Sequence, residues 1–135
     1  MKEETEFQPR LYIIMREDLW DMNPGKAMAQ AAHAQADFDA QIEKEIPKLK
    51  PDREVWREDR NFGTTIVLSG TLDQLNNIVS KFDYFDVAAG MTVDPTYPYR
   101  NYYGKVFTSE EVTCGWLFAA TQEQADLVAH LPLHQ

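Results

Sequence analysis

Apolar residues in this chain fall into short runs rich in strand formers, separated by stretches with helical spacing. The run R-L-Y-I-I-M-R, Arg10–Arg16, is bounded by charge and predicts a strand that is buried on both faces. The β-branched and aliphatic run N-F-G-T-T-I-V-L-S-G, Asn61–Gly70, predicts a second strand that ends at a glycine. Two further runs, Phe85–Val93 and Val112–Phe118, predict a third and a fourth strand.

The first predicted helix begins at Asn23-Pro24, where asparagine can cap the backbone and proline can occupy the first helical position. We expect it to run to about Glu45, because Pro47 and Pro51 break the pattern beyond that point. Residues 46–60 mix both charge signs with these two prolines. They therefore predict a connection with room for one further helical turn.

Capping signals mark two more helices. Thr71 and Gln74 form a capping-box pattern ahead of apolar residues at helical spacing, and Thr121 precedes a stripe of Ala125, Val128 and Ala129. Strands that alternate with helices predict an α/β fold. We expect a single three-layer domain, in which a four-stranded mixed sheet carries helices on both faces and the parallel strand pairs have right-handed crossovers.

Length and composition agree with that prediction. A chain of 135 residues, 44% hydrophobic and 26% charged, is long enough for one packed core and has the composition of a folded protein. We expect residues 1–9 to form a flexible N-terminal segment and residues 10–135 to form the domain.

The sequence holds no apolar run long enough to span a bilayer, and it starts without the basic and apolar regions of a signal peptide. These features predict a cytoplasmic protein. The single cysteine, Cys114, lies in the apolar run V-T-C-G-W-L-F, which predicts a small buried thiol rather than a nucleophile. A net charge of -9 argues against ordinary nucleic-acid binders, which present a basic surface to phosphates.

The first predicted helix carries two different stripes. Small residues at Ala27, Ala31 and Ala34 would let it approach the sheet closely. A second stripe, at spacings of four, three and four, is polar and consists of Lys26, Gln30, His33 and Asp37.

The start of this helix is a candidate anion site. Gly25 leaves room for a ligand at the helix start, where free N–H groups attract anions, and Lys26 adds a positive charge at the same place. Such a site suits a phosphate or a developing oxyanion. The spacing alone is equally typical of an ordinary solvated helix face, with His33 a satisfied, half-buried histidine.

The stretch R-E-D-L-W-D-M-N-P-G-K-A-M-A-Q-A-A-H-A resembles the N-terminal signature of the type 2 peptidyl-tRNA hydrolases. Trp56 ahead of G-T-T-I-V-L and the ending A-D-L-V-A-H-L-P-L are also similar to the family, and the elements follow the family order from about Leu11 to Leu133. The anchors of the first motif are Arg16, Asp18, Leu19, Met22, Gly25, Lys26, Ala29, Gln30, His33 and Ala34.

This resemblance implies a hydrolase that cleaves the ester between a peptide and the terminal ribose of tRNA, without a metal or another cofactor. Lys26 would stabilise the negative charge of the tetrahedral intermediate or bind a phosphate of the tRNA end. Asp94 matches the aspartate that follows the family's third strand and would orient water or act as a base. The family's next threonine is Pro98 here, so Thr96 and Thr113 are the hydroxyls that would replace the family threonines.

The remaining candidates would bind substrate, and they are Arg16, Gly25, Gln30, His33, Tyr97 and Arg100. In an acidic chain, tRNA binding would depend on a local patch around Lys26, Arg16 and Arg100 and would weaken steeply with salt. The stretch after Asp94 is longer than we expect for the family. It is rich in tyrosine, at Tyr97, Tyr99, Tyr102 and Tyr103, and these rings would either stack on unpaired RNA bases or pack the loop against the protein.

The departures of this sequence from the family pattern suggest alternative functions. A non-catalytic member of the fold that binds a protein or nucleotide partner would explain the missing threonines and the acidity. A phosphate-binding nucleotide domain ranks lower, because neither G-x-G-x-x-G nor G-x-x-x-x-G-K-[ST] occurs. His33, His130 and His134 lack ligand spacing, which predicts no metal site. The family resemblance further implies a homodimer.

Overall fold

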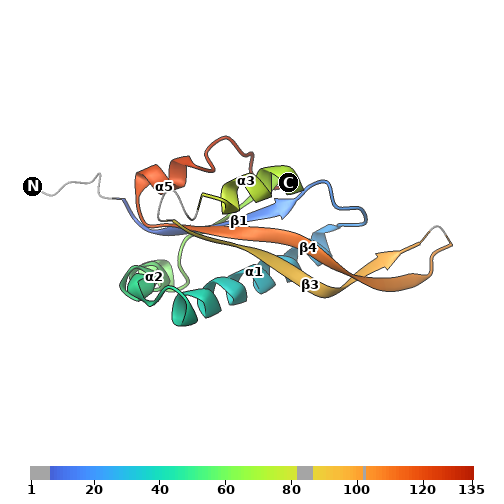
Figure 1. Ribbon diagram of the computed structural model, residues 1–135, viewed down its shortest axis with the longest axis horizontal. Helices are drawn as coiled ribbons and strands as arrows, with labels where there is room; N and C mark the ends of the chain where they lie inside the picture. Colours follow the sequence, from blue (N-terminus) through green and yellow to red (C-terminus); the bar gives the residue numbers. More distant parts are fainter. Residues whose placement is uncertain (1–6, 82–86, 102) are drawn as a thin grey trace, which may run out of the picture.

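The protein has three layers, with α3 and α5 on one face of the sheet and α1 and α2 on the other (Figure 1). This computed structural model describes residues 7–81, 87–101 and 103–135. Short 3₁₀ turns, Pro47–Leu49 and Asp59–Asn61, flank α2. In chain order the elements are β1 Arg10–Arg16, α1 Pro24–Lys44, α2 Lys50–Glu58, β2 Thr65–Gly70, α3 Leu72–Val79, β3 Ala88–Arg100, β4 Val106–Ala119 and α5 Gln122–Asp126.

The sheet has four strands in the order β2-β1-β4-β3. β1 is parallel to β2 and antiparallel to β4, and β3 is antiparallel to β4, so the predicted four-stranded mixed sheet is confirmed. β1 is buried along its whole apolar run, as predicted. Because side chains alternate along a strand, β1 supplies both layers of the core: Leu11, Ile13 and Met15 face α1 and α2, whereas Tyr12 and Ile14 face α3 and α5.

The core under α1 is aromatic. Phe38 of α1 meets Trp56 and Trp116 edge-on, at interplanar angles of 87° and 63°. On the opposite face α3 approaches the sheet closely, because Gly115 leaves no side chain beneath it. A Cβ at that position would lie 2.4 Å from the Leu75 side chain and 2.9 Å from the carbonyl oxygen of Gly90.

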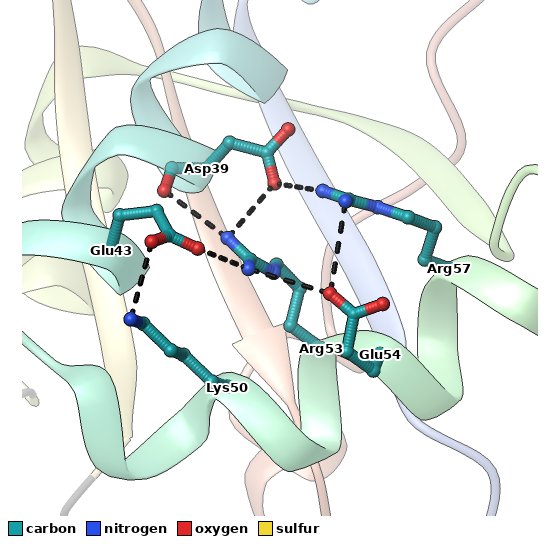
Figure 2. Close-up of polar contacts among 6 residues, drawn as sticks. All are labelled: Asp39, Glu43, Lys50, Arg53, Glu54 and Arg57. Atoms are coloured by element: carbon teal, nitrogen blue, oxygen red, sulfur yellow. Dashed lines mark hydrogen bonds and ion pairs between the residues drawn. The ribbon is translucent and has the colours of Figure 1, made fainter.

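α1 ends at Lys44, ahead of Pro47, as predicted. The nine-residue helix α2 is longer than the single helical turn predicted between residues 46 and 60. Pro51 does not prevent it, because it lies in the first turn of α2, where proline needs no N–H partner. Charged side chains join α2 to α1 (Figure 2), and they are Asp39, Glu43, Lys50, Arg53, Glu54 and Arg57.

Arg53 is the centre of this cluster. Only 6% of its side chain is exposed, and its guanidinium pairs with Glu43 and lies 3.6 Å from Asp39, both on α1. The three acidic and three basic side chains of the cluster balance one another. A buried arginine of this kind is tolerated because its partners satisfy its charge.

β3 and β4 are longer than predicted. The stretch expected to be a loop continues both strands into a hairpin whose end projects beyond the helices (Figure 1). Pro95 and Pro98 are tolerated because β3 lies at the edge of the sheet, where a missing N–H breaks no ladder. A register shift between Asp94 and Tyr97 accommodates the first proline.

The ends of the chain differ from the predictions in detail. α5 begins after the predicted Thr121 cap but continues only to Asp126, and Ala129 of its expected stripe is exposed. The last residues instead pair with β2: the Ser69 N–H donates to the Pro132 carbonyl, and the His134 N–H donates to the Val67 carbonyl. Residues 1–6 of the expected flexible segment, the predicted strand start at 85–86 and residue 102 lie outside the described ranges.

Candidate functional site

Lys26 lies in the first turn of α1, directly under β3. The side-chain oxygen of Asn23 accepts a hydrogen bond from the Lys26 N–H at 2.9 Å, which confirms the predicted cap. The Lys26 amine donates to the Pro98 carbonyl at 2.6 Å, to the Asp21 carboxylate at 3.0 Å and to the Asp21 carbonyl at 3.1 Å. An ammonium has three N–H donors, so these contacts engage all of them.

Asp21 is the counter-charge of this lysine, and sequence reasoning assigned it no role. Its backbone is left-handed, with φ of 68°, and its carboxylate also accepts the backbone N–H of Arg100 at 2.8 Å. The hydrogen bond from Lys26, followed by that from Arg100, lowers the pKa of Asp21 below its ordinary value. A small pocket of about 140 Å³ opens here, lined by Asp21, Asn23, Lys26, Pro98, Tyr99, Arg100 and Val106.

Tyr97 forms the buried wall beside Lys26. Its ring centroid lies 5.1 Å from the Lys26 amine, and its hydroxyl donates to the Asp21 carbonyl at 3.2 Å. Burial, helped by the nearby charges of Asp21 and Asp94, raises the pKa of Tyr97 to about 12. The tyrosine therefore stays neutral and positions the Asp21 loop.

Asp94 is half-buried on β3, and two donors hold its carboxylate. The Gln30 amide donates to one oxygen at 2.7 Å, and the Thr96 N–H donates to the other at 2.9 Å. Burial alone would raise the pKa of Asp94, but these hydrogen bonds and the charge of His33 outweigh it and lower the pKa. The carboxylate is therefore charged at neutral pH.

Gln30 connects this carboxylate to the interior. The Thr113 hydroxyl, fully buried on β4, donates to the Gln30 side-chain carbonyl at 2.6 Å. A carboxylate only accepts hydrogen bonds, so Gln30 must present its NH₂ group to Asp94 and its carbonyl to Thr113. The hydroxyl of Thr113 thus fixes the orientation of the amide that holds Asp94.

The contacts of Lys26 and those of Asp94 both lie where α1 packs on β3. Lys26 and Gln30 are one helical turn apart and face the same strand, and they contact Pro98 and Asp94, which are four residues apart. Their polar partners differ, and Asp94 does not line the pocket that contains Lys26. The two predicted catalytic side chains therefore belong to one α1–β3 junction, without direct contact between them.

The other predicted residues lie around this junction. Arg16, at the end of β1, donates to Asp18 at 2.9 Å and to the Val112 carbonyl at 2.9 Å, and neither of these partners lines the Lys26 pocket. Gly25 is exposed at the start of α1, and a Cβ there would meet no heavy atom closer than 3.6 Å. His33 is exposed on α1 and acts on Asp94 only through its charge.

A larger hollow lies on the other flank of α1, toward β2. It measures about 360 Å³ and is lined mainly by apolar side chains: Met15, Met22, Asn23, Pro24, Ala27, Met28, Ala31, Val67, His134 and Gln135. It shares only Asn23 with the Lys26 pocket. Nothing in the spacing of the sequence signalled it, because it forms only where the C-terminal residues approach α1.

Residues 7–81, 87–101 and 103–135 present neither a cluster of metal ligands nor a helix that could span a membrane. Within them, no three His, Cys, Asp or Glu side chains come together in a way that would hold a metal ion. None of the helices in the same ranges combines the length and the apolar character needed to cross a membrane.

Comparisons with known proteins bear on the fold and on the family. A solved structure of a protein of unknown function, Atu0240 from Agrobacterium tumefaciens strain C58, matches with a TM-score of 0.57 and 13% identity, over 96% of this chain and 99% of that one. At this identity the likeness concerns the fold alone. No curated protein matches.

The model of the family described as "Peptidyl-tRNA hydrolase PTH2" matches residues 10–100. These residues include β1, α1, α2, β2, α3 and β3, with Lys26, Gln30 and Asp94. The chain therefore belongs to the type 2 peptidyl-tRNA hydrolase family.

Proposed function

We propose that this chain hydrolyses the ester between a peptide, or an N-acylated amino acid, and the terminal ribose of tRNA, and that it needs no metal ion. The family acts on peptidyl-tRNA. One observation supports the assignment of residues: Lys26 and Gln30, one turn apart on α1, both reach β3, and Gln30 does so at the carboxylate of Asp94.

Asp94 would hold the attacking water. Its lowered pKa keeps it charged at neutral pH, so it can orient a water molecule and accept the proton that this water loses as it attacks. In the proposed step, water adds to the ester carbonyl carbon and gives up a proton by way of Asp94. The bond to the ribose oxygen then breaks, and that oxygen takes the proton, which leaves a peptide acid and a ribose hydroxyl.

Lys26 would stabilise the oxyanion that forms when water adds, or a phosphate next to the ester. Since all three of its N–H donors are engaged, substrate must displace Asp21 or share the amine with it. Asp21→Asn keeps the shape of this side chain and removes the competing charge. We expect this variant to have a lower KM for substrate than the wild-type protein.

Thr113 and Thr96 would act differently from each other. Thr113 is fully buried, so we assign it a positioning role through Gln30 rather than contact with substrate. Thr96 is exposed, and its hydroxyl lies 3.5 Å from Asp94, close enough to contact the same water.

The deciding experiment measures release of N-acetylated amino acid from tRNA. We expect Lys26→Ala to abolish release and Asp94→Asn to slow it by about 10²- to 10⁴-fold, the usual contribution of a group that handles the proton. Lys44→Ala is the matched control, because it removes an exposed lysine at the other end of the same helix. Wild-type protein that releases nothing at low salt would overturn the assignment.

A second function is favoured by the neutralised lysine and the buried threonine. A non-catalytic member of the fold would bind a protein or nucleotide partner and leave the ester intact. It predicts that wild-type protein ignores both acylated and uncharged tRNA in a binding assay.

Two further proposals are a cytoplasmic location, predicted from the apolar pattern of the sequence, and a homodimer, which the family resemblance alone supports. Light scattering on the purified chain tests the second, because a mass near 15.6 kDa at micromolar concentration would identify a monomer.

A further inference from the structure

Three aromatic rings stack near the turn of the projecting hairpin. Trp20 comes from the loop before α1, Tyr99 from β3 and Phe107 from β4. The ring centroids of Trp20 and Tyr99 are 5.6 Å apart with an interplanar angle of 15°, and those of Tyr99 and Phe107 are 5.5 Å apart at 21°. The three segments thus form one nearly parallel stack.

This arrangement differs from the aromatic core. There, Phe38 and Trp56 meet edge-on at 87°, Trp56 and Phe118 meet edge-on at 85°, whereas Phe38 and Phe118 approach a parallel arrangement, at 35°. Tyr99 also meets one buried ring, Tyr97, edge-on at 76°. Parallel rings are instead the geometry in which flat bases stack on side chains. The stack therefore resembles a stacking surface more than an extension of the core.

The stack is open at its ends. Tyr99, the middle ring, is only 8% exposed, whereas Trp20 is 60% exposed and Phe107 is 48% exposed. Burial, helped by the neighbouring Glu111, raises the pKa of Tyr99, so the hydroxyl of the middle ring stays neutral. Trp20 and Phe107 therefore leave aromatic surface that a further flat ring can contact.

Positive charge lies next to the rings. Arg100 and Lys105 are exposed on the same hairpin, and Arg100 lines the Lys26 pocket together with Tyr99. The stack is therefore continuous with the proposed hydrolytic site. Flat exposed rings beside cations match the chemistry of unpaired nucleotides, whose bases stack and whose phosphates carry negative charge.

We propose that Trp20, Tyr99 and Phe107 form a stacking surface for the unpaired 3′ end of tRNA, with Arg100 and Lys105 at its phosphates. This inference rests on the proposed function, because it specifies how that substrate is held. It also accounts for RNA binding by a chain of net charge -9, since stacking supplies affinity that does not depend on a broad basic surface.

Tryptophan fluorescence tests the proposal directly. Trp56 and Trp116 are each only 1% exposed, so Trp20 is the tryptophan that a base can reach. The probe is an uncharged RNA minihelix with an unpaired 3′ tail, compared with the same minihelix made blunt. We expect the tailed RNA to quench the fluorescence saturably and the blunt RNA to bind at least about tenfold more weakly, the effect of losing one base stack.

Variants locate the binding. Phe107→Ala, with all tryptophans intact, is expected to weaken binding of the tailed minihelix by about tenfold, and Trp20→Ala is expected to do the same when binding is followed by anisotropy of labelled RNA. Phe62→Ala is the matched control, because Phe62 is 82% exposed but precedes β2, at the opposite edge of the sheet. Circular dichroism confirms that each variant is folded.

The outcomes separate this inference from the proposed hydrolysis. The probe carries no ester, so tail binding by a protein that releases no peptide would support the stack and overturn the hydrolase assignment. Equal binding of tailed and blunt RNA, or unchanged binding by both Trp20→Ala and Phe107→Ala, would overturn the stack even if hydrolysis is observed. Protection of Trp20 by self-association, with no response to either RNA, would identify a protein interface instead and would also overturn it.

Discussion

The hydrogen-bond chain from Thr113 through Gln30 to Asp94 can be tested by replacing its middle member. Gln30→Met keeps the length of the side chain and removes both polar ends. Gln30 is only 3% exposed and Thr113 is fully buried, so no water replaces the lost partner of the threonine hydroxyl. An unsatisfied buried hydroxyl costs about 1–3 kcal/mol, and the lost bond to the half-buried carboxylate adds about 1.5 kcal/mol. We expect a total loss of about 2.5–4.5 kcal/mol in the free energy of unfolding.

A second substitution distinguishes this mechanism from simple loss of packing. Thr113→Val alone leaves the Gln30 carbonyl unpaired and should cost about 1–3 kcal/mol. In the double variant neither group is left unpaired, so the loss should fall to about 1.5 kcal/mol, below that of Gln30→Met alone. Urea unfolding of the four proteins gives the coupling energy. Penalties that add within about 0.5 kcal/mol would refute the hydrogen-bond chain.

The pKa of Asp94 provides an independent readout. A carboxylate with a lowered folded pKa stabilises the protein above its unfolded pKa of about 3.9, and this stability is lost as the pH falls through the folded pKa. Because Gln30→Met removes a donor, the folded pKa should rise toward the ordinary value. Carbon-detected NMR titration of Asp94 measures that change, and an unaltered pKa would contradict the assigned bond.

Three other predictions concern stability and reactivity. Arg53→Met should destabilise the protein by about 1–3 kcal/mol in urea unfolding, less than the loss of a fully buried pair, because its acidic partners can rehydrate. Arg57→Ala, at an exposed position, should cost under about 1 kcal/mol. Equal losses would contradict the central role of the buried guanidinium. Burial raises the pKa of Cys114 to about 11, so the thiol should react with a disulfide reagent at pH 8 only after urea unfolding, and rapid reaction of the folded protein would contradict its burial. Gly115→Ala should cost about 1–3 kcal/mol, because its Cβ would meet a leucine of α3 and a backbone oxygen. Gly25→Ala should be neutral or should stabilise the helix by up to about 1 kcal/mol. Thermal melts compare the two variants, and a tolerated Gly115→Ala would show that α3 can move away.

Local signals predicted the parts of the fold that depend on nearby residues. The Asn23 cap and Pro24 set the start of α1, and Thr71 with Gln74 forms the predicted capping box at α3. Each of these features involves atoms within one helical turn. They can therefore be read from sequence without knowledge of the sheet.

Elements that depend on their tertiary position were predicted wrongly. α2 was predicted only as a connection with room for one helical turn, and its buried Arg53 makes sense only once α1 supplies the acidic partners. The hairpin, which contains Pro95 and Pro98, was predicted as a loop. Their tolerance follows from the edge position of β3, which no local pattern reveals.

In the candidate site, too, the sequence identified some residues and left others unassigned. The helical stripe and the family resemblance singled out Lys26, Gln30 and Asp94. The bond from Thr113 to Gln30 spans 83 residues, and the ion pair of Asp21 depends on a left-handed turn before α1. Spacing could not assign either partner, because both contacts arise only when the strands and α1 come together.

Contacts within the chain cover β2 and the Pro98 end of β3, at the two margins of the sheet, which restricts how two copies of this chain could assemble. The outer side of β2 is paired with the chain's own last residues, through Ser69 and Val67. On the outer side of β3, Pro98 has no N–H to offer, and its carbonyl accepts the Lys26 amine. A sheet continued into a second subunit through β2, or through the Pro98 end of β3, would have to displace one of these contacts. Association through the helical layers or the hairpins would let both subunits keep the lysine contact.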